Sequence, residues 1–180
     1  MTNYASFYAE VRELLFGGVL SQSQFDGINA ILNAWDPGTD SRWVAYALAT
    51  AYHETAKAMQ PVREIGKGAG RPYGKPEPNG NVYYGRGLVQ LTWATNYKKF
   101  GELVHAPLYD NPDLALQPDI AAKIMTIGMT EGGFTGRKLG DYFWGPHADW
   151  TDARRIINGL DRAWLIAGYA MHFYHALEEV

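Results

Sequence analysis

The sequence contains no cysteine among its 180 residues. Disulfide bonds, thiolate metal sites and cysteine nucleophiles are therefore excluded together, and the fold has to be stabilised by packing alone. This composition suits synthesis in a reducing cytoplasm. The sequence also lacks any run of Lys or Arg, and its formal net charge is -3. We therefore expect no extended basic surface for nucleic acid or for an anionic membrane.

Long hydrophobic runs are absent as well. The N-terminal stretch MTNYASFYAEVRELLFGG carries Glu10 and Glu13 and has no basic start followed by an apolar core, so we expect no signal peptide. The most apolar stretch near the C-terminus, AWLIAGYAMHFYHAL, is shorter than the roughly 20 residues that span a bilayer. It predicts a buried helix, and stable insertion into a membrane is not expected.

The pattern of apolar residues predicts one compact, mainly helical domain over residues 1–180, of which 47% are hydrophobic. The helix that starts at Asp40 or Ser41 is apolar on nearly every side up to Tyr52, which is typical of a central core helix. Residues 61–87 lack helical periodicity and predict small strands and loops. The fold class is therefore α+β. Further helices are predicted at 5–16, after Ser21, around 88–103, after Pro118, within 149–159 and from 163.

Three common kinds of catalytic motif are incomplete. His53 is followed by Glu54, but Lys57 stands where a zinc protease has its second histidine. The stretch GKGAGR lacks the Lys-Ser/Thr ending of a phosphate-binding loop. No G-x-S-x-G nucleophile elbow is present. The sequence therefore predicts neither a metal nor an organic cofactor, and carboxylate chemistry remains.

Two glutamates stand ten positions apart at the end of the predicted core helix. Glu54 follows the apolar stretch, where burial and the negative end of the helix dipole would both disfavour its charged form, as suits a proton donor. Glu64 lies in a polar segment beside Arg63 and Lys67, which would favour its carboxylate. Such a pair is typical of the general acid and general base of glycoside hydrolysis. The alternative is that Glu54 is an exposed last residue of its helix and Glu64 an ordinary surface charge.

The block NVYYGRGLVQLTWATNY, residues 81–97, interleaves polar and apolar side chains. If a helix begins at Thr92, then Thr92 and Asn96 share a face, where a hydroxyl and an amide can orient a water and bind sugar hydroxyls. The alternative is that Thr92 is only the N-cap of a helix that starts at Trp93. The chain is 14% aromatic, which suits stacking against sugars, although most such rings are expected in the core.

Five stretches form a specific pattern: HET at 53–55, YYGRGLVQLTWATNY at 83–97, NPDLAL at 111–116, GGFTGRKLGDYF at 132–143 and RRIINGLDRA at 154–163. Together, over about residues 40–175, they resemble the catalytic domain of glycoside hydrolase family 19, and most of all its bacteriophage endolysin branch. The resemblance implies a lysozyme-like α+β fold with two lobes and a substrate cleft. It also implies hydrolysis of β-1,4 bonds between N-acetylated sugars with inversion.

The resemblance also implies roles for single residues. Glu54 matches the general acid, Glu64 is the best match for the general base, and Thr92 matches the residue that helps to hold the attacking water. An inverting pair implies carboxyl groups roughly 6.5 to 9.5 Å apart. Tyr83 and Arg86 are expected to shape the cleft. The set of expected substrate-binding residues is His53, Tyr83, Arg86, Gln90, Asn96 and Asn158.

The chain departs from the family pattern in three places. Ala56 and Lys57 replace two glycines that often follow H-E-T, and the disulfides of plant members are absent. Met171 stands where many relatives have a basic residue, so an ionic link from the terminal helix to the cleft is not expected.

The leading hypothesis is a monomeric endolysin that hydrolyses the glycan strands of peptidoglycan during lysis of a bacterial host. Without a signal peptide, it would be made in the host cytoplasm and reach the periplasmic wall through a separate, holin-like permeabilising protein. The alternative enzyme is a chitinase acting on N-acetylglucosamine polymers. A third hypothesis is an inactive carbohydrate-binding module. The presence of both glutamates and Thr92 argues against it, because binding needs neither an acid nor a base.

Overall fold

The computed structural model describes residues 4–179, and within them the α+β prediction is confirmed. The α-helices are α1 (Ala5–Leu14), α2 (Gln22–Leu32), α3 (Ser41–Glu54), α4 (Ala94–Leu103), α5 (Pro118–Thr130) and α6 (Ala163–Glu178). The strands are β1 (Val62–Arg63), β2 (Arg86–Gly87), β3 (Phe143–Trp144) and β4 (His147–Ala148). Short 3-10 helices cover Pro72–Gly74, Pro112–Leu116, Leu139–Asp141 and Asp152–Ile156.

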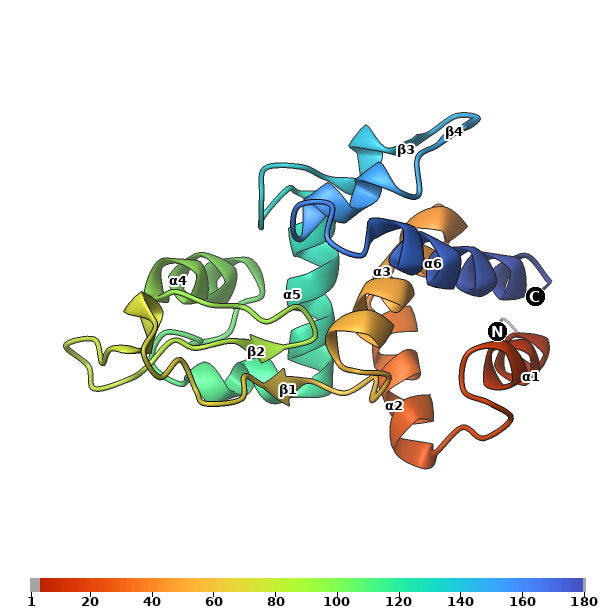
Figure 1. Ribbon diagram of the computed structural model, residues 1–180. Helices are drawn as coiled ribbons and strands as arrows, with labels where there is room; N and C mark the ends of the chain where they lie inside the picture. Colours follow the sequence, from red (N-terminus) through yellow and green to blue (C-terminus); the bar gives the residue numbers. More distant parts are fainter. Residues whose placement is uncertain (1–3, 180) are drawn as a thin grey trace.

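The elements form two lobes (Figure 1). One lobe contains α4 and the antiparallel pair of β1 and β2, in which Val62 faces Gly87 and Arg63 faces Arg86. The other lobe contains α1, α3 and α6, and α5 stands between the two. The second antiparallel pair, β3 with β4, is a hairpin that projects beyond the helices.

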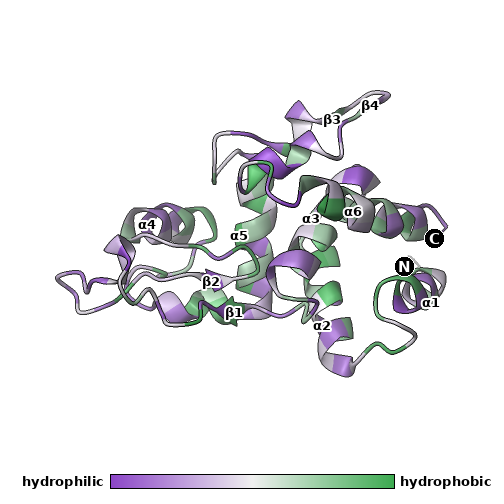
Figure 2. Ribbon diagram, in the orientation of Figure 1, coloured by the Kyte–Doolittle hydropathy of each residue, from purple (hydrophilic) through white to green (hydrophobic). Residues whose placement is uncertain are grey.

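Helix α3 is the central helix of the core, as the sequence predicted. Its residues 44–52 are all buried, and it packs along α6. The carboxylate of Asp40 accepts a hydrogen bond from the backbone N–H of Arg42 and caps the start of the helix, because the first N–H groups of a helix have no internal partner. Figure 2 shows hydrophobic residues along α3, α5 and α6, where these helices face one another.

The segment before α4 differs from the sequence prediction. Residues 88–93 are not helical, because Leu91 folds back and exchanges two backbone hydrogen bonds with Arg86. Helix α4 therefore begins at Ala94, and its N-terminal neighbour is Trp93 with φ of 72°. The alternative in which Thr92 is an N-cap is wrong. The hairpin of β3 and β4 was not foreseen either, since its strands have two residues each.

Among residues 4–179, no helix has the length and hydrophobicity that a membrane span requires.

Gly27 of α2 permits a close approach between α2 and the segment after α3. A Cβ at this position would lie 1.8 Å from the carbonyl oxygen of Met59. We therefore expect Gly27→Ala to lower the free energy of unfolding by about 1–3 kcal/mol, as overpacking does. Gly168→Ala is the matched control, since a Cβ there meets nothing within 4 Å on α6, and it should be neutral or stabilising. Urea denaturation measures both, and equal stability of the two variants would contradict the prediction.

Candidate active site

Glu54 is the last residue of α3, and its carboxylate is held by an arginine from a distant segment. Glu54 Oε1 lies 2.8 Å from Nη1 of Arg154, whose side chain is only 3% exposed. Arg154 also donates from Nε to the carbonyl of Asp161. The chain turns directly after Glu54, because the hydroxyl of Thr55 donates to Ala51 and accepts the N–H of Met59. Glu54 is therefore a half-buried, oriented carboxylate, not a freely exposed helix end.

The contact between Arg154 and Glu54 did not follow from the sequence pattern. The apolar residues before Glu54 predicted a carboxyl among apolar groups, whereas a buried cation contacts it. Met171 of α6 is exposed, so the terminal helix indeed supplies no charge at that position. The cation comes from the 3-10 helix Asp152–Ile156 instead. The arginine pair in RRIINGLDRA was the available signal, but only the tertiary structure shows which of the two points inward.

His53 precedes Glu54 and is half-buried. Burial is the main cause that lowers the pKa of His53, so the imidazole is neutral near pH 7. The charges of Glu54, Arg154, Arg162 and Asp161 all act on it. These side chains therefore gather around the end of α3.

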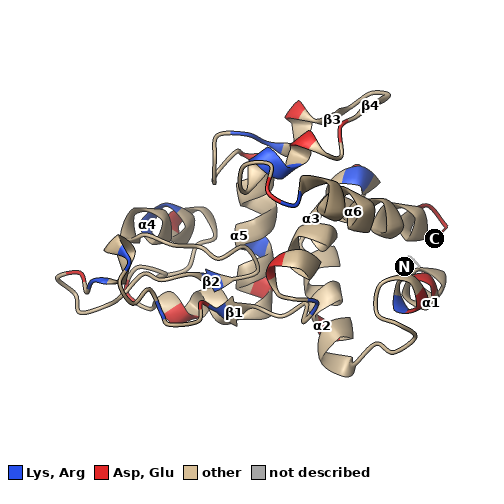
Figure 3. Cartoon of the chain, viewed as in Figure 1, with Lys and Arg blue, Asp and Glu red and all other residues tan. Residues whose placement is uncertain are grey.

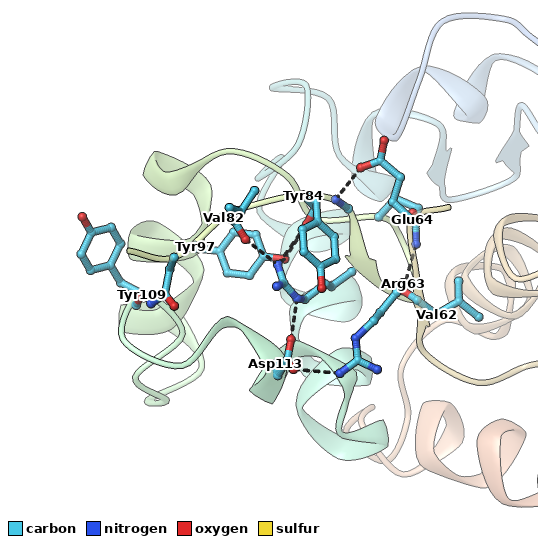
Figure 4. Close-up of polar contacts among 12 residues, drawn as sticks. Val62, Arg63, Glu64, Val82, Tyr84, Tyr97, Tyr109 and Asp113 are labelled. Atoms are coloured by element: carbon cyan, nitrogen blue, oxygen red, sulfur yellow. Dashed lines mark hydrogen bonds and ion pairs between the residues drawn. The ribbon is translucent and has the colours of Figure 1, made fainter. Parts of the chain in front are cut away.

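Glu64 follows β1 on the other lobe, and both oxygens of its carboxylate accept a hydrogen bond. Oε1 accepts from the hydroxyl of Tyr73 at 2.8 Å, and Oε2 accepts from the backbone N–H of Gly85 at 3.0 Å. Figure 4 shows the carboxylate reaching toward the segment that leads into β2. A Cβ on Gly85 would come within 2.7 Å of Oε1 of Gln90 and 3.3 Å of Cβ of Glu64, so a larger residue would require the Gln90 side chain to move. Such fixed geometry favours a functional carboxylate over an ordinary surface charge.

A buried arginine supports the strand pair that carries Glu64. Arg86 of β2 is 4% exposed and donates from Nε to Asp113 and from Nη1 to the carbonyl of Val82. Its guanidinium lies 3.6 Å from the ring centroid of Tyr84. Arg63 binds the second oxygen of Asp113, so one carboxylate joins β1 to β2 (Figure 4).

The side chains of Tyr83 and Arg86 are both buried. Tyr83 is 1% exposed, and its hydroxyl donates to the carbonyl of Tyr109. The expectation that these two residues shape the cleft stays a prediction. Their predicted contact with a substrate stays a prediction as well, although both side chains are almost fully buried. The sequence pattern cannot distinguish a buried arginine from an exposed one.

The other predicted residues divide between the two lobes. Gln90 donates from its amide to the carbonyl of Val62, beside Glu64. Asn96 donates to the backbone carbonyl of Thr92, so these two residues are joined although Thr92 lies outside α4. Asn158 is exposed and its backbone N–H donates to Arg154, on the side of Glu54. Their contact with a substrate and the expected separation of the two carboxyl groups stay predictions.

Within residues 4–179, no group of three or more His, Asp or Glu side chains is arranged to hold a metal ion.

Comparison with solved structures identifies the class of fold. Chitinase C from Streptomyces griseus HUT6037 superposes with a TM-score of 0.65 at 23% identity, covering 98% of this chain and 76% of that one. A bacterial family 19 chitinase superposes with a TM-score of 0.59 at 26% identity, covering 97% and 94%. The fold is thus the lysozyme-like fold of a glycosidase domain.

Sequence comparison identifies the family. The family described as "Chitinase class I" matches residues 33–133, more than half of the chain. The chain therefore belongs to glycoside hydrolase family 19, as the motifs indicated. Chitinase 3 from rice, Oryza sativa, is 31% identical over 113 residues, which are 50% of this chain and 35% of that protein. Endochitinase At2g43620 from Arabidopsis thaliana is 30% identical over 107 residues, which are 58% and 38%. The matches thus span little more than a third of these relatives.

The ion pairs of Asp113 give a prediction about stability and pH. Burial would raise the pKa of Asp113, but hydrogen bonds from Arg63 and Arg86 outweigh it and lower that pKa. A lowered pKa means stability that is present above the unfolded value of about 3.9 and is lost as the pH falls through the folded value. Asp113→Asn should cost about 1 kcal/mol at pH 7, because the carboxylate is half-exposed and screened.

The difference between Asp113→Asn and the parent protein should shrink below about pH 4, where the parent carboxyl also becomes neutral. Chemical denaturation over a pH series measures it. The exposed Asp110, whose side chain has no hydrogen bond among the described residues, provides the control Asp110→Asn, which should leave stability unchanged. A difference that does not depend on pH would contradict the prediction.

The hydroxyl of Tyr73 gives a prediction about catalysis. Tyr73→Phe removes the hydrogen bond to Glu64 but keeps the ring, which packs edge-on against Trp93. If Glu64 is the base that the sequence predicts, kcat for glycoside hydrolysis should fall about tenfold with little change in KM, because its carboxylate loses alignment while substrate contacts are kept. Tyr169→Phe is the control, as no hydrogen bond of its hydroxyl is among those of the described residues. Unchanged kcat in Tyr73→Phe would contradict a positioning role.

Proposed function

We propose that this chain hydrolyses β-1,4 glycosidic bonds between N-acetylated sugars with inversion of configuration. The observation that carries this proposal is the pair of oriented glutamates on the two lobes. Glu54 is held by a buried arginine, and Glu64 by a tyrosine hydroxyl and a backbone N–H. An inverting glycosidase needs one carboxyl group to protonate the leaving oxygen and another to activate a water.

In the proposed mechanism Glu54 is the general acid. Oε1 of Glu54 is held by Arg154, while Oε2 has no hydrogen-bond partner among the described residues and is available to carry the transferred proton. Glu64 is the general base and takes a proton from the attacking water. Thr92 and Asn96, joined by their own hydrogen bond, are the groups proposed to hold that water and the neighbouring sugar. The two oxygens of Glu64 each keep a lone pair for the water, since each accepts one bond from the protein.

A polymer of N-acetylglucosamine is the best-supported substrate. The family description and the names of the matched proteins refer to chitinases and endochitinases, from plants and from Streptomyces. None of these comparisons supports the similarity to endolysins that the sequence motifs suggested. The chitinase alternative therefore takes precedence over the endolysin hypothesis.

Peptidoglycan is the second candidate, and one observation favours it. Arg162 is exposed, makes no ion pair among the described residues and lies close enough to His53 for its charge to act on it. Peptidoglycan carries carboxylates on its lactyl-peptide substituents, whereas chitin is uncharged. An exposed cation whose charge acts on His53, the neighbour of the proposed acid, suits the charged polymer. Host lysis, a holin-like partner, a monomeric state and action in the periplasm belong to this candidate.

Replacing the proposed acid tests the function. Glu54→Gln should reduce turnover by about 10² to 10⁴, because the proton donor is removed. The amide oxygen of glutamine can still accept the hydrogen bond of Arg154, so we expect the fold to be retained, and thermal unfolding checks this. Glu102→Gln is the matched control, since Glu102 is an exposed residue of α4. Activity of Glu54→Gln above about one hundredth of the parent value would contradict an acid role.

The substrate is tested by offering purified peptidoglycan and colloidal chitin side by side and identifying the new reducing sugar. Release of N-acetylglucosamine oligomers from chitin alone supports the first candidate. Clearing of peptidoglycan alone, lost in Arg162→Gln, supports the second. Hydrolysis of neither polymer would contradict the proposed function.

A further inference from the structure

The hairpin of β3 and β4 presents an aromatic pair at its tip. Trp144 and His147 face each other directly in the strand register, and Gly145 and Pro146 form the turn between them. Their rings are stacked, with centroids 5.1 Å apart and an angle of 27° between the planes. Trp144 is nevertheless 59% exposed. One face of the indole is thus covered by the imidazole, and the ring remains accessible to a ligand.

The backbone of this hairpin is clamped by the first turn of α3. Nη1 of Arg42 donates to the carbonyls of Gly145 and His147, each at 3.0 Å. Nε1 of Trp43 donates to the carbonyl of Phe143 at 3.3 Å. Arg42 is itself oriented by hydrogen bonds to both carboxylate oxygens of Asp40. Three carbonyl groups of a very short hairpin are therefore held by side chains of the core helix.

These hydrogen bonds from Arg42 and Trp43 fix the backbone around Trp144, unlike that of an exposed hydrophobic residue on an unsupported loop. An isolated two-stranded hairpin is marginally stable in water, so the bonds from α3 are what order it. The inner residue Phe143 is 1% exposed and packs against Tyr46 and Trp150, which anchors the base. A rigid, exposed ring loses little conformational entropy when it binds. The hairpin is preorganised for a ligand that stacks on a flat ring.

The chemistry around the ring indicates which ligand fits. Residues 142–148 contain no Lys, Arg, Asp or Glu, and Figure 3 shows the hairpin without charged residues. Anionic polymers such as nucleic acids need cations at their binding sites. A sugar ring instead offers an apolar C–H face to an indole and hydroxyl groups to a neighbouring imidazole. The tip therefore matches the face of a polysaccharide.

We propose that Trp144 and His147 form a secondary polysaccharide-binding site, separate from the catalytic pair. The proposal rests on the proposed function, in which the substrate is an N-acetylated polysaccharide. The hairpin lies outside residues 33–133, the part that matches the family, so this site is a feature of the remaining chain. Helix α3 connects the two sites, with the clamp at its start and Glu54 at its end.

The length of α3 separates the hairpin from Glu54, and this separation determines which substrates can contact both sites. Fourteen helical residues span about 20 Å, so a short oligosaccharide bound at Glu54 does not reach Trp144. An insoluble polymer offers many sugar units and can occupy both sites at once. Binding at the hairpin then keeps the enzyme on the polymer and raises its effective concentration there. The site is expected to affect hydrolysis of polymers and not of short oligomers.

Sedimentation with insoluble polymer tests the proposal in the Glu54→Gln background, which prevents degradation during the measurement. We expect the addition of Trp144→Ala to weaken binding to colloidal chitin or peptidoglycan about fivefold or more. Trp144→Phe should restore most of the binding, since it retains a flat ring. Trp164→Ala is the matched control, because Trp164 is 76% exposed on α6 and has no part in the hairpin.

Comparing hydrolysis of an insoluble polymer with hydrolysis of a short oligomer distinguishes a role of the hairpin from a role in the catalytic site. In the background with Glu54 intact, Trp144→Ala should reduce hydrolysis of the insoluble polymer and leave the rate on a short soluble oligomer of the same sugar unchanged. Equal binding by Trp144→Ala and its parent would overturn the inference, as would equal losses in Trp144→Ala and Trp164→Ala. A matching loss on the short oligomer would place Trp144 in the catalytic site and would also overturn it. Polymer binding that depends on Trp144 without any hydrolysis would instead overturn the proposed function alone.

Discussion

Burial of α3 is the constraint on which the rest of the structure depends. This helix is surrounded by other elements along residues 44–52, and its side chains can be apolar only because α6 and neighbouring segments cover them. Because α3 is packed on all sides, the positions of its first and last residues are fixed relative to the rest of the protein. Its last residue is Glu54, and its first turn carries Arg42 and Trp43. The position of the proposed acid and the order of the β3–β4 hairpin are therefore two consequences of the same packing.

The other lobe is held together mainly by polar contacts. Strands of two residues bury little apolar surface, so β1 and β2 rely on Arg86 and Asp113 to hold them. A buried guanidinium is tolerated here because its Nε donates to the carboxylate of Asp113 and its Nη1 to the carbonyls of Val82 and Tyr84 and the hydroxyl of Tyr97. Gly85 directly precedes Arg86, and its backbone N–H donates to Oε2 of Glu64, so the position of this segment helps to orient the carboxylate. The two glutamates thus stand on supports of different kinds, one made by hydrophobic packing and one by an ion-pair network.

Membership of family 19 and the two oriented carboxylates both support glycoside hydrolysis, but they do not specify the polymer. Two further features are proposed to bear on that choice: Arg162, whose charge acts on His53, and the uncharged aromatic tip of the hairpin. Under the proposals made above, Arg162 favours a charged polymer, and the hairpin favours the sugar face of an N-acetylated polysaccharide. Differences between related enzymes are expected in such positions, since loops and hairpins tolerate change better than a core helix does.

The sequence by itself determined the fold class, the core helix and its end at Glu54, because apolar periodicity and capping residues are local signals. It also identified the family, since H-E-T and Y-Y-G-R-G-x-x-Q-L-T lie at recognisable positions. Only the tertiary structure decided that Arg154 partners Glu54, a contact across 100 positions of sequence, and that Tyr73 and Gly85 hold Glu64. It likewise decided that Tyr83 and Arg86 are buried and that residues 88–93 fold back instead of forming a helix. Those outcomes depend on hydrogen bonds between distant segments, which no local pattern encodes.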